Sequence, residues 1–145
     1  MFIKQLSVFL ENRPGTLQES LTILKQSDVN IVALSLADTN EFGLLRLIVD
    51  KPDDAKAALK KGGYSSMLND VLAVRLVQRV GYLQELMDMI SQAGINIEYM
   101  YTASTGPDGA DMIMKTSDLA ATEKVLENTK TGVLAQDDLR KLGGR

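Results

Sequence analysis

The segment Asn12-Arg13-Pro14-Gly15-Thr16-Leu17 contains residue types that suit the binding of a small charged molecule. Gly15 has no Cβ, so a ligand could approach the backbone closely there. Asn12 carries an amide that donates and accepts hydrogen bonds, and it can therefore meet both an ammonium and a carboxylate group. A helix that begins after this segment would direct its unpaired N–H groups and its partial positive charge at the same place, which favours a carboxylate.

The composition removes many other chemistries. The chain has 145 residues, with no histidine and no cysteine. It therefore cannot form a Ser-His-Asp triad, a thiolate nucleophile, a disulfide, or a metal site built from imidazole or thiolate. Asp50, Asp53 and Asp54 stand near Pro52, but acidic residues are common where a helix begins because its dipole favours them. We expect neither a metal site nor a cofactor.

Charge and hydropathy argue against two classes of partner. The 16 basic and 19 acidic residues give a formal net charge of −3, without the basic clusters that nucleic acid requires. No apolar run approaches the roughly 20 residues that span a bilayer. The first residues, 1–5, lack the apolar region of a signal peptide. We expect a cytoplasmic protein that binds neither nucleic acid nor a membrane.

The loop occurs a second time, 66 residues further along the chain, as Gln78-Arg79-Val80-Gly81-Tyr82-Leu83. Each loop is followed by Gln-Glu, and the similarity extends in both directions. The residues that are identical at this offset, named in the first copy, are Leu6, Val8, Leu10, Arg13, Gly15, Leu17, Gln18, Glu19, Gln26, Asn30, Ile31, Ala37 and Thr39. The chain therefore contains two copies of one small unit.

Each copy shows the same succession of strand and helix patterns. In the first copy we expect strands at 6–10, 30–37, 44–49 and 65–68, and helices at 17–24 and from Pro52 to Gly62-Gly63. In the second copy we expect strands at 72–76, 96–103, 110–115 and 132–135, and helices at 83–90 and around 122–126. Turns are expected at 39–43 and 105–109. In the third strand an offset of 67 keeps one apolar face, because it aligns Leu45, Leu47 and Val49 with Met112, Met114 and Thr116.

The order β-α-β-β-α-β, repeated once, predicts an α+β fold of two ferredoxin-like units. Each unit would be an antiparallel sheet with both helices on one face. We assign the first domain to residues 1–69 and the second to residues 70–145. The polar tail at 136–145 is expected to form one helical turn before it frays. A unit of this size buries a small core and gains from pairing with its twin.

The fold alone does not determine the function. RNA recognition by such units relies on aromatic residues of the central strands, and segment 44–49 has none. Soft-metal transport relies on thiolates, which are absent. Acylphosphate hydrolysis remains an alternative, with Arg13 and Asn12 holding the phosphate and a water molecule.

The two loops and the strands that follow them resemble the ACT domain, a family that regulates amino-acid metabolism by binding free amino acids. The resemblance rests on Asn12-Arg13-Pro14-Gly15-Thr16-Leu17 with Asn30-Ile31, and on Gly81-Tyr82-Leu83 with Gly94-Ile95-Asn96-Ile97. It covers nearly the whole chain as a tandem pair, without an attached catalytic domain. The second copy departs from the motif, with Gln78 and Val80 in the places of Asn and Pro.

The resemblance implies that two units pair side by side, with the loop of one facing the second strand of the other. Asn12 and Gly15 would then face Asn96-Ile97, while Gln78 and Gly81 would face Asn30-Ile31. The expected ligand-binding residues are Asn12, Arg13, Pro14, Gly15, Thr16, Leu17, Asn30, Ile31, Gln78, Gly81, Tyr82, Asn96 and Ile97. A simpler interpretation is that Arg-Pro-Gly only connects a strand to a helix, and that the two asparagines only begin strands.

We therefore predict a non-enzymatic regulatory protein that binds a free amino acid at the interface between two ACT-like units. The segment 31–37 is apolar on both faces, which indicates a homodimer. A regulated metabolic enzyme is a further candidate partner. The alternatives are a protein–protein interaction module without a ligand and a small acylphosphatase-like hydrolase.

Overall fold

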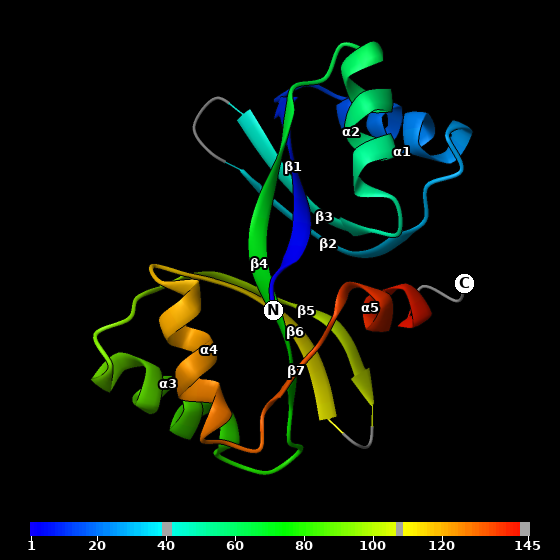
Figure 1. Ribbon diagram of the computed structural model, residues 1–145. Coiled ribbons are helices and arrows are strands. Elements are labelled where there is room, and N and C mark those ends of the chain that lie inside the picture. Colours follow the sequence, from blue (N-terminus) through cyan, green and yellow to red (C-terminus); the bar gives the residue numbers. More distant parts are fainter. Residues whose placement is uncertain (39–41, 107–108, 143–145) are drawn as a thin grey trace. The chain divides into compact units, whose positions relative to one another are not determined.

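A computed structural model describes residues 1–38, 42–106 and 109–142. In chain order the elements are β1 (Ile3–Glu11), α1 (Thr16–Gln26), β2 (Ile31–Asp38), β3 (Phe42–Val49), α2 (Pro52–Lys61), β4 (Ser66–Leu76), α3 (Tyr82–Gln92), β5 (Ile97–Gly106), β6 (Gly109–Thr116), α4 (Leu119–Glu127), β7 (Gly132–Val133) and α5 (Gln136–Leu142) (Figure 1). Part of each predicted turn, residues 39–41 and 107–108, lies outside the described residues.

The chain divides into two compact units, each of which holds one copy of the repeat. The N-unit comprises residues 4–69 and the chain from Leu139 onward, and the C-unit comprises residues 1–3 and 70–138. The sequence predicts boundaries at 1–69 and 70–145. The structure differs at the two chain ends, because residues 1–3 belong to the C-unit and the chain from Leu139 belongs to the N-unit. The amino group of Met1 pairs with the Glu123 carboxylate of the C-unit. Arg140 Nε donates to the carbonyl oxygen of Asp50 in the N-unit at 3.1 Å.

In the N-unit the strands have the order β2-β3-β1-β4, and α1 and α2 cover one face (Figure 1). β3 is antiparallel to both β1 and β2. β1 and β2 therefore run parallel, as a strand–helix–strand crossover requires. The core between the sheet and the helices consists of Leu6, Val8, Leu10, Leu24, Val29, Leu45, Leu47, Val49, Ala55 and Leu59. It includes Leu45, Leu47 and Val49, which the sequence places on one apolar face of the third strand.

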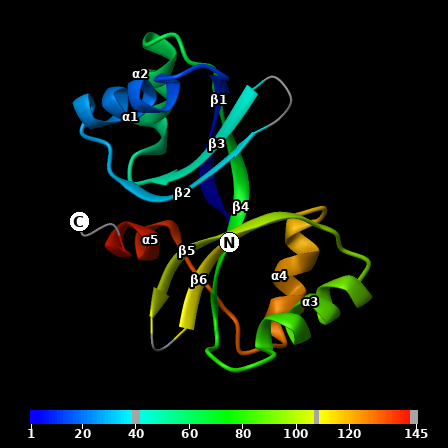
Figure 2. The same cartoon turned by 180° about the vertical axis from the view of Figure 1, so that it is seen from behind.

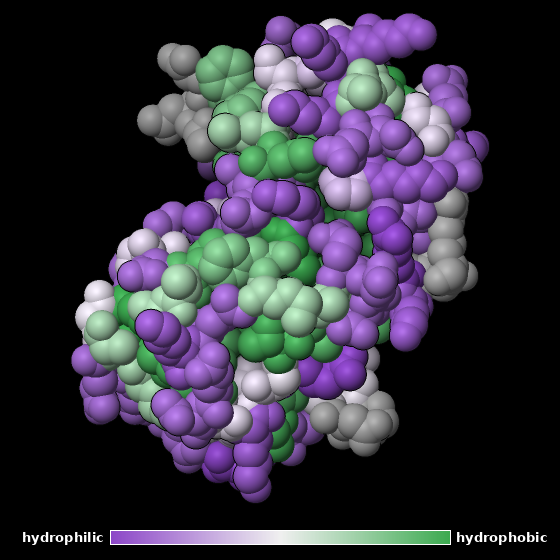
Figure 3. All heavy atoms as spheres, in the orientation of Figure 1, coloured by the Kyte–Doolittle hydropathy of each residue, from purple (hydrophilic) through white to green (hydrophobic). Residues whose placement is uncertain are grey.

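The C-unit repeats this arrangement with β5-β6-β4 and with β7 on the other side of β4, and α3 and α4 cover one face (Figure 2). Val8 lies opposite Leu45 in the N-unit, and Val74 lies opposite Met112 in the C-unit. This register confirms the predicted offset of 67 in the third strand. The predicted ferredoxin-like architecture is thus confirmed for each unit. In the view of Figure 3, hydrophobic surface residues gather mainly on the C-unit.

Strand β4 differs from the prediction in one respect. The segments 65–68 and 72–76, predicted as separate strands, are joined in one strand of eleven residues, Ser66–Leu76. Asn69 stands between them and accepts a hydrogen bond from the Ser7 hydroxyl at 2.8 Å. Because the polar side chain has a partner on β1, it does not interrupt the strand. One continuous strand is therefore the last of the first repeat and the first of the second.

The prediction of a single helical turn in the C-terminal segment is wrong, and residues 143–145 lie outside the described residues. α5 has seven residues, Gln136–Leu142, and Leu139 within it is only 1% exposed. The Asp138 carboxylate accepts from the Ala135 N–H at 2.8 Å, which fixes the start of the helix. A buried leucine and an ordered first turn explain why residues 136–142 form a helix. Within the described residues, no helix has the length and apolar character needed to cross a membrane.

Leu139→Ala tests whether α5 belongs to the folded core. We expect the free energy of unfolding to fall by about 2–5 kcal/mol, because a fully buried leucine is truncated. Urea unfolding followed by circular dichroism would measure this change. Leu142→Ala is the matched control, since this leucine of the same helix is 39% exposed; its effect should stay below about 0.5 kcal/mol. Equal effects of the two substitutions would contradict the packing of α5.

Candidate functional site

The candidate site is built around the loop between β1 and α1. Gly15 immediately precedes α1 with φ +91°, and Gly81 precedes α3 with φ +84°. This left-handed conformation costs an L-residue with a side chain roughly 1–2 kcal/mol, so glycine is favoured at both turns. Both helices then begin at the following residue. The repeated glycine of the sequence therefore marks the same backbone turn in both units.

Thr16 ties the loop to the end of β1. Its hydroxyl lies 3.0 Å from the carbonyl oxygen of Glu11, to which it donates, and 3.3 Å from that of Arg13. Its side chain is buried. The N–H of Glu19 donates to the carbonyl oxygen of Gly15 at 2.9 Å and closes the first helical turn. These bonds give the loop one defined backbone path between strand and helix.

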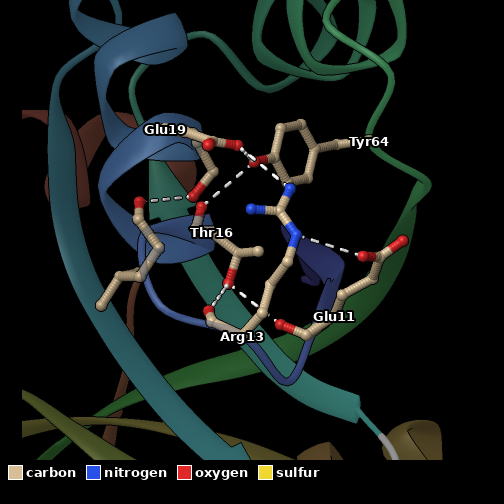
Figure 4. A network of polar contacts seen from close by, with 7 residues as sticks. Glu11, Arg13, Thr16, Glu19 and Tyr64 are labelled. Carbon is tan, nitrogen blue, oxygen red and sulfur yellow. Dashed lines mark hydrogen bonds and ion pairs between the residues drawn. The ribbon is translucent and has the colours of Figure 1, made fainter.

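A polar network covers this corner of the N-unit (Figure 4). Arg13 contacts the carboxylates of Glu11 and Glu19, through Nε at 3.2 Å and a terminal nitrogen at 3.5 Å. The Tyr64 hydroxyl donates to Glu19 at 2.6 Å, and it also lies 3.3 Å from the carbonyl oxygen of Thr16. The network therefore joins the loop, the first turn of α1 and the segment that follows α2.

These contacts shift the titration of the network. The hydrogen bond from Tyr64, followed by that from Arg13, lowers the pKa of Glu19 below its ordinary value. Burial, followed by the hydrogen bond to Glu19, raises the pKa of Tyr64. The two carboxylates raise the pKa of Arg13, with the hydrogen bond to Glu11 as the largest cause. Glu19 is thus held in its ionised form and Arg13 in its charged form.

A cavity of about 230 Å³ lies beside the loop, against the end of β2. It is lined by the predicted residues Asn12, Arg13, Gly15, Thr16 and Leu17. The structure adds residues that the sequence did not identify: Leu10 and Glu11 at the end of β1, Gly43 in β3, and Leu36, Ala37 and Asp38 at the end of β2. Pro14 is exposed and does not line the cavity. The parallel course of β1 and β2 explains the arrangement, since their carboxyl ends meet at the same edge.

Asn30 and Ile31 lie at the opposite end of β2 from the cavity in their own unit. The N–H of Asn30 donates to the Asp50 carboxylate at 2.9 Å, and its carbonyl oxygen accepts from the Asp50 N–H at 3.1 Å. Asn96 makes the corresponding pair of bonds with Ser117, at 3.0 and 2.9 Å. These bonds fix where β2 and β5 begin. Within one unit, therefore, the structure does not bring the loop and the Asn-Ile pair together.

The loop of the C-unit keeps the arginine–glutamate pair and changes its surroundings. Arg79 donates to both carboxylate oxygens of Glu85, at 3.2 and 2.8 Å, and thereby lowers the pKa of Glu85. Its guanidinium lies 5.3 Å from the centre of the Tyr82 ring. Tyr82 is buried, with its hydroxyl 2.6 Å from that of Thr131.

A cavity of about 360 Å³ in the C-unit is lined by Val77, Arg79, Tyr82, Glu85, Leu86, Met89, Asn128, Thr129 and Lys130. Of the predicted residues of this loop it includes Tyr82, whereas Gln78 and Gly81 are exposed and stand apart from it. The two units therefore present different surfaces at corresponding loops.

Sequence reasoning missed Tyr64 and the residues at the end of β2. Tyr64 follows Gly62-Gly63, a pair that the sequence marks only as the end of a helix. Leu36 belongs to an apolar strand whose pattern does not show that the end of the strand meets the loop. The topology contained the missing signal, because a right-handed crossover places the carboxyl ends of β1 and β2 at the same edge of the sheet.

Comparisons with known proteins agree with this geometry. The sequence matches the family described as ACT domain pair over residues 1–143. The chain therefore belongs to the ACT domain pair family, and the resemblance predicted from the two loops is confirmed. A search of curated proteins finds no match.

Solved structures show the same fold. The chain is similar to protein BT0572 from Bacteroides thetaiotaomicron, with 35% sequence identity, a TM-score of 0.90 and coverage of 97% of both chains. The regulatory subunits of aspartate kinase from Thermus thermophilus and Thermus flavus match with TM-scores of 0.60 and 0.61 and identities of 14% and 16%. Each of these two matches covers 86% of this chain and 90% of the other.

Glu19→Gln tests the network through the pH dependence of stability. Because folding lowers the pKa of Glu19, its stabilising contribution is present above the ordinary pKa and is lost as the pH falls through the lowered value. Urea midpoints measured between about pH 6 and pH 3 should fall less steeply for the variant than for the native chain. Glu98→Gln, an exposed glutamate of β5, is the control and should leave the slope unchanged. An unaltered slope in Glu19→Gln would show that the network does not titrate with folding.

Proposed function

We propose that this protein is a non-enzymatic regulatory protein that binds a free amino acid at the interface between two ACT-like units. The β1–α1 loop of the N-unit forms one wall of the proposed site. The observation that carries the proposal is the cavity of about 230 Å³ beside that loop. It combines a glycine turn, a helix start and polar side chains in a volume suited to a ligand smaller than a drug-sized molecule.

The loop offers groups for both charges of an amino acid. No side chain caps the N-terminus of α1, whereas Asp118 caps α4 by accepting from the Ala121 N–H at 2.9 Å. A carboxylate at the loop would meet the N–H groups of the first turn of α1. Asn12 and Asp38 line the same cavity with exposed polar groups. The Asp38 carboxylate suits an ammonium group, and the Asn12 amide suits either charge.

The second wall comes, in this proposal, from the second strand of a neighbouring ACT-like unit. Asn96 and Ile97 begin that strand in the C-unit, and Asn30 and Ile31 begin it in the N-unit. In the proposal, Gln78, Gly81 and Tyr82 form the corresponding loop of the C-unit.

A homodimer is part of the proposal. β2 is the outer strand of the N-unit, where Leu34 and Leu36 are 50% and 51% exposed. An edge strand with exposed leucines favours association with another surface. A monomer at all concentrations in analytical ultracentrifugation would contradict the dimer.

The proposed role is regulation of a metabolic enzyme in the cytoplasm. Two of the solved structures that share this fold are regulatory subunits of aspartate kinase, which supports a regulatory role without naming the enzyme here. A ligand that binds one arrangement of units more tightly than another shifts their equilibrium toward that arrangement, and this difference in affinity is the source of allosteric coupling.

Calorimetric titration of the full chain with each of the standard amino acids tests the function. We expect at least one to bind, and Asn12→Ala to weaken that binding by about tenfold, because one hydrogen bond to a charged group is lost. Gln26→Ala is the control, since it removes an exposed amide at the far end of α1 and should leave the affinity unchanged. Absence of binding across the whole panel would contradict the proposal.

A protein–protein interaction module without a ligand is the second candidate, favoured by the exposed leucines of β2. It would give no response in the same titrations but a stable partner in pull-down experiments. An acylphosphatase-like hydrolase is disfavoured, because the Arg13 guanidinium that would hold the phosphate already contacts the carboxylates of Glu11 and Glu19. Inertness toward an acylphosphate would exclude it directly.

A further inference from the structure

The cavity of the N-unit has an aliphatic floor that the C-unit keeps only in part. We propose that the ligand is an amino acid with an aliphatic side chain, and that each chain holds one such site, in the N-unit. This inference rests on the proposed function and names the class of ligand. Leu10, Leu17 and Leu36 supply the floor, and Gly43 lies between two of them.

The strand register places these groups on the face of the sheet that carries the helices. Leu10 lies opposite Gly43, and Leu36 lies opposite the buried Leu45. Leu36 therefore points to the side of the core, yet it remains 51% exposed because it lies on the outer strand. Leu17 is half-buried and packs on the core from α1. An aliphatic side chain placed between Leu17 and Leu36 would remove apolar surface from water, which is favourable.

Gly43 enlarges the cavity without being required by the backbone. A Cβ at this position would lie 3.6 Å from Leu10 Cβ and 3.8 Å from Leu36 Cδ1, both ordinary contact distances. The missing methyl group is therefore space on the floor of the cavity, between two leucines. A branched aliphatic side chain can use this space by dispersion contact on both sides.

The charged groups of the cavity lie at the end of β1, in the loop and at the end of β2, and they are Glu11, Arg13 and Asp38. The Glu11 and Asp38 carboxylates suit the ammonium of the ligand, whereas Arg13 already contacts the carboxylates of Glu11 and Glu19. The N–H groups of the first turn of α1 suit the ligand carboxylate. The floor contributes no donor or acceptor side chain. A charged or strongly polar ligand side chain would lose its hydration there without a partner, which is unfavourable. The cavity thus separates a charged rim from an apolar floor.

The C-unit has different residues at the corresponding positions. Because Val74 lies opposite Met112 as Val8 lies opposite Leu45, the register makes Ala110 the counterpart of Gly43. Thr102 lies opposite Met112 and is the counterpart of Leu36. A methyl group therefore occupies the space left by Gly43, and a hydroxyl replaces the exposed leucine. The counterparts of Leu10 and Leu17 remain leucines, Leu76 and Leu83. The C-unit therefore keeps part of the apolar floor but lacks both the space and the exposed leucine, so the inference assigns one site to each chain.

Isothermal titration calorimetry of the full chain tests this inference with valine, leucine and isoleucine against serine, aspartate, lysine and phenylalanine. We expect the branched aliphatic amino acids to bind at least about tenfold more tightly than the others, with one site per chain. Leu36→Thr introduces the residue of the C-unit and should weaken binding by about tenfold or more. Gly43→Ala should weaken isoleucine and leucine more than valine, because it fills the floor.

Leu34→Thr is the matched control for Leu36→Thr. Leu34 lies on the same strand with nearly the same exposure, 50% against 51%, but it does not line the cavity. Both substitutions remove an exposed leucine from the edge strand, so an effect on association alone would be equal in the two variants. Only an effect through the cavity would distinguish them. Thermal melts should show that all three variants remain folded.

The outcomes separate this inference from the proposed function. Tightest binding of a polar, charged or aromatic amino acid would overturn the aliphatic class and leave the amino-acid-binding function intact. Two equivalent sites per chain, or equal effects of Leu36→Thr and Leu34→Thr, would also overturn it. Absence of any amino-acid binding would instead contradict the proposed function itself.

Discussion

The left-handed turn at Gly15 is the local constraint on which the candidate site depends. β1 ends at Glu11, and the turn at Gly15 starts α1 at the next residue and allows the chain to return over the sheet as a crossover. That crossover makes β1 and β2 parallel and places their carboxyl ends at one edge. The cavity lies at this edge because the loop, the end of β2 and Gly43 of β3 all reach it. Gly81 imposes the same turn on the C-unit, so the two loops have one backbone plan and differ through their side chains.

The main difference between the two corners is an exchange of one tyrosine and one threonine. In the N-unit, Thr16 starts α1 and Tyr64 follows α2; in the C-unit, Tyr82 starts α3 and Thr131 follows α4. Tyr64 reaches the loop from outside and contacts the Thr16 carbonyl oxygen at 3.3 Å, whereas Tyr82 is buried and meets the Thr131 hydroxyl at 2.6 Å. Each unit thus has one tyrosine at this position, and its hydroxyl is hydrogen-bonded. In the N-unit the smaller residue of the pair, Thr16, begins α1 and lines the cavity.

The sequence predicted features that repeat and missed features that depend on contacts between distant segments. The duplicated loops, the alternating strands and the shifted offset of the third strand could be read because the hydrophobic period is local. Tyr64, Leu36 and Asp38 reach the site only through the topology, since each is distant from the loop in the chain. Leu139 could not be identified as buried because two leucines in a short polar segment do not show which of them faces the core; Leu142 is 39% exposed. The union of 65–68 and 72–76 in β4 was missed because Asn69 and Asp70 resemble a break until the bond between Ser7 and Asn69 is seen.

The surroundings of the β1–α1 loop and of the β4–α3 loop also differ in charge. The N-unit corner has Glu11, Glu19 and Asp38 against a single arginine, Arg13. In the C-unit, Val77 replaces Glu11, Arg79 forms a bidentate pair with Glu85, and Lys130 adds a positive charge to the same corner. Surface charges are screened over about 8–10 Å at ordinary salt, so only nearby groups affect a ligand. An excess of carboxylates within that distance favours the ammonium of an amino acid, while the first turn of α1 favours its carboxylate. Backbone groups, carboxylates, one amide and an aliphatic floor can together recognise such a ligand, and this explains how a binding site of this kind can exist in a chain that has neither histidine nor cysteine.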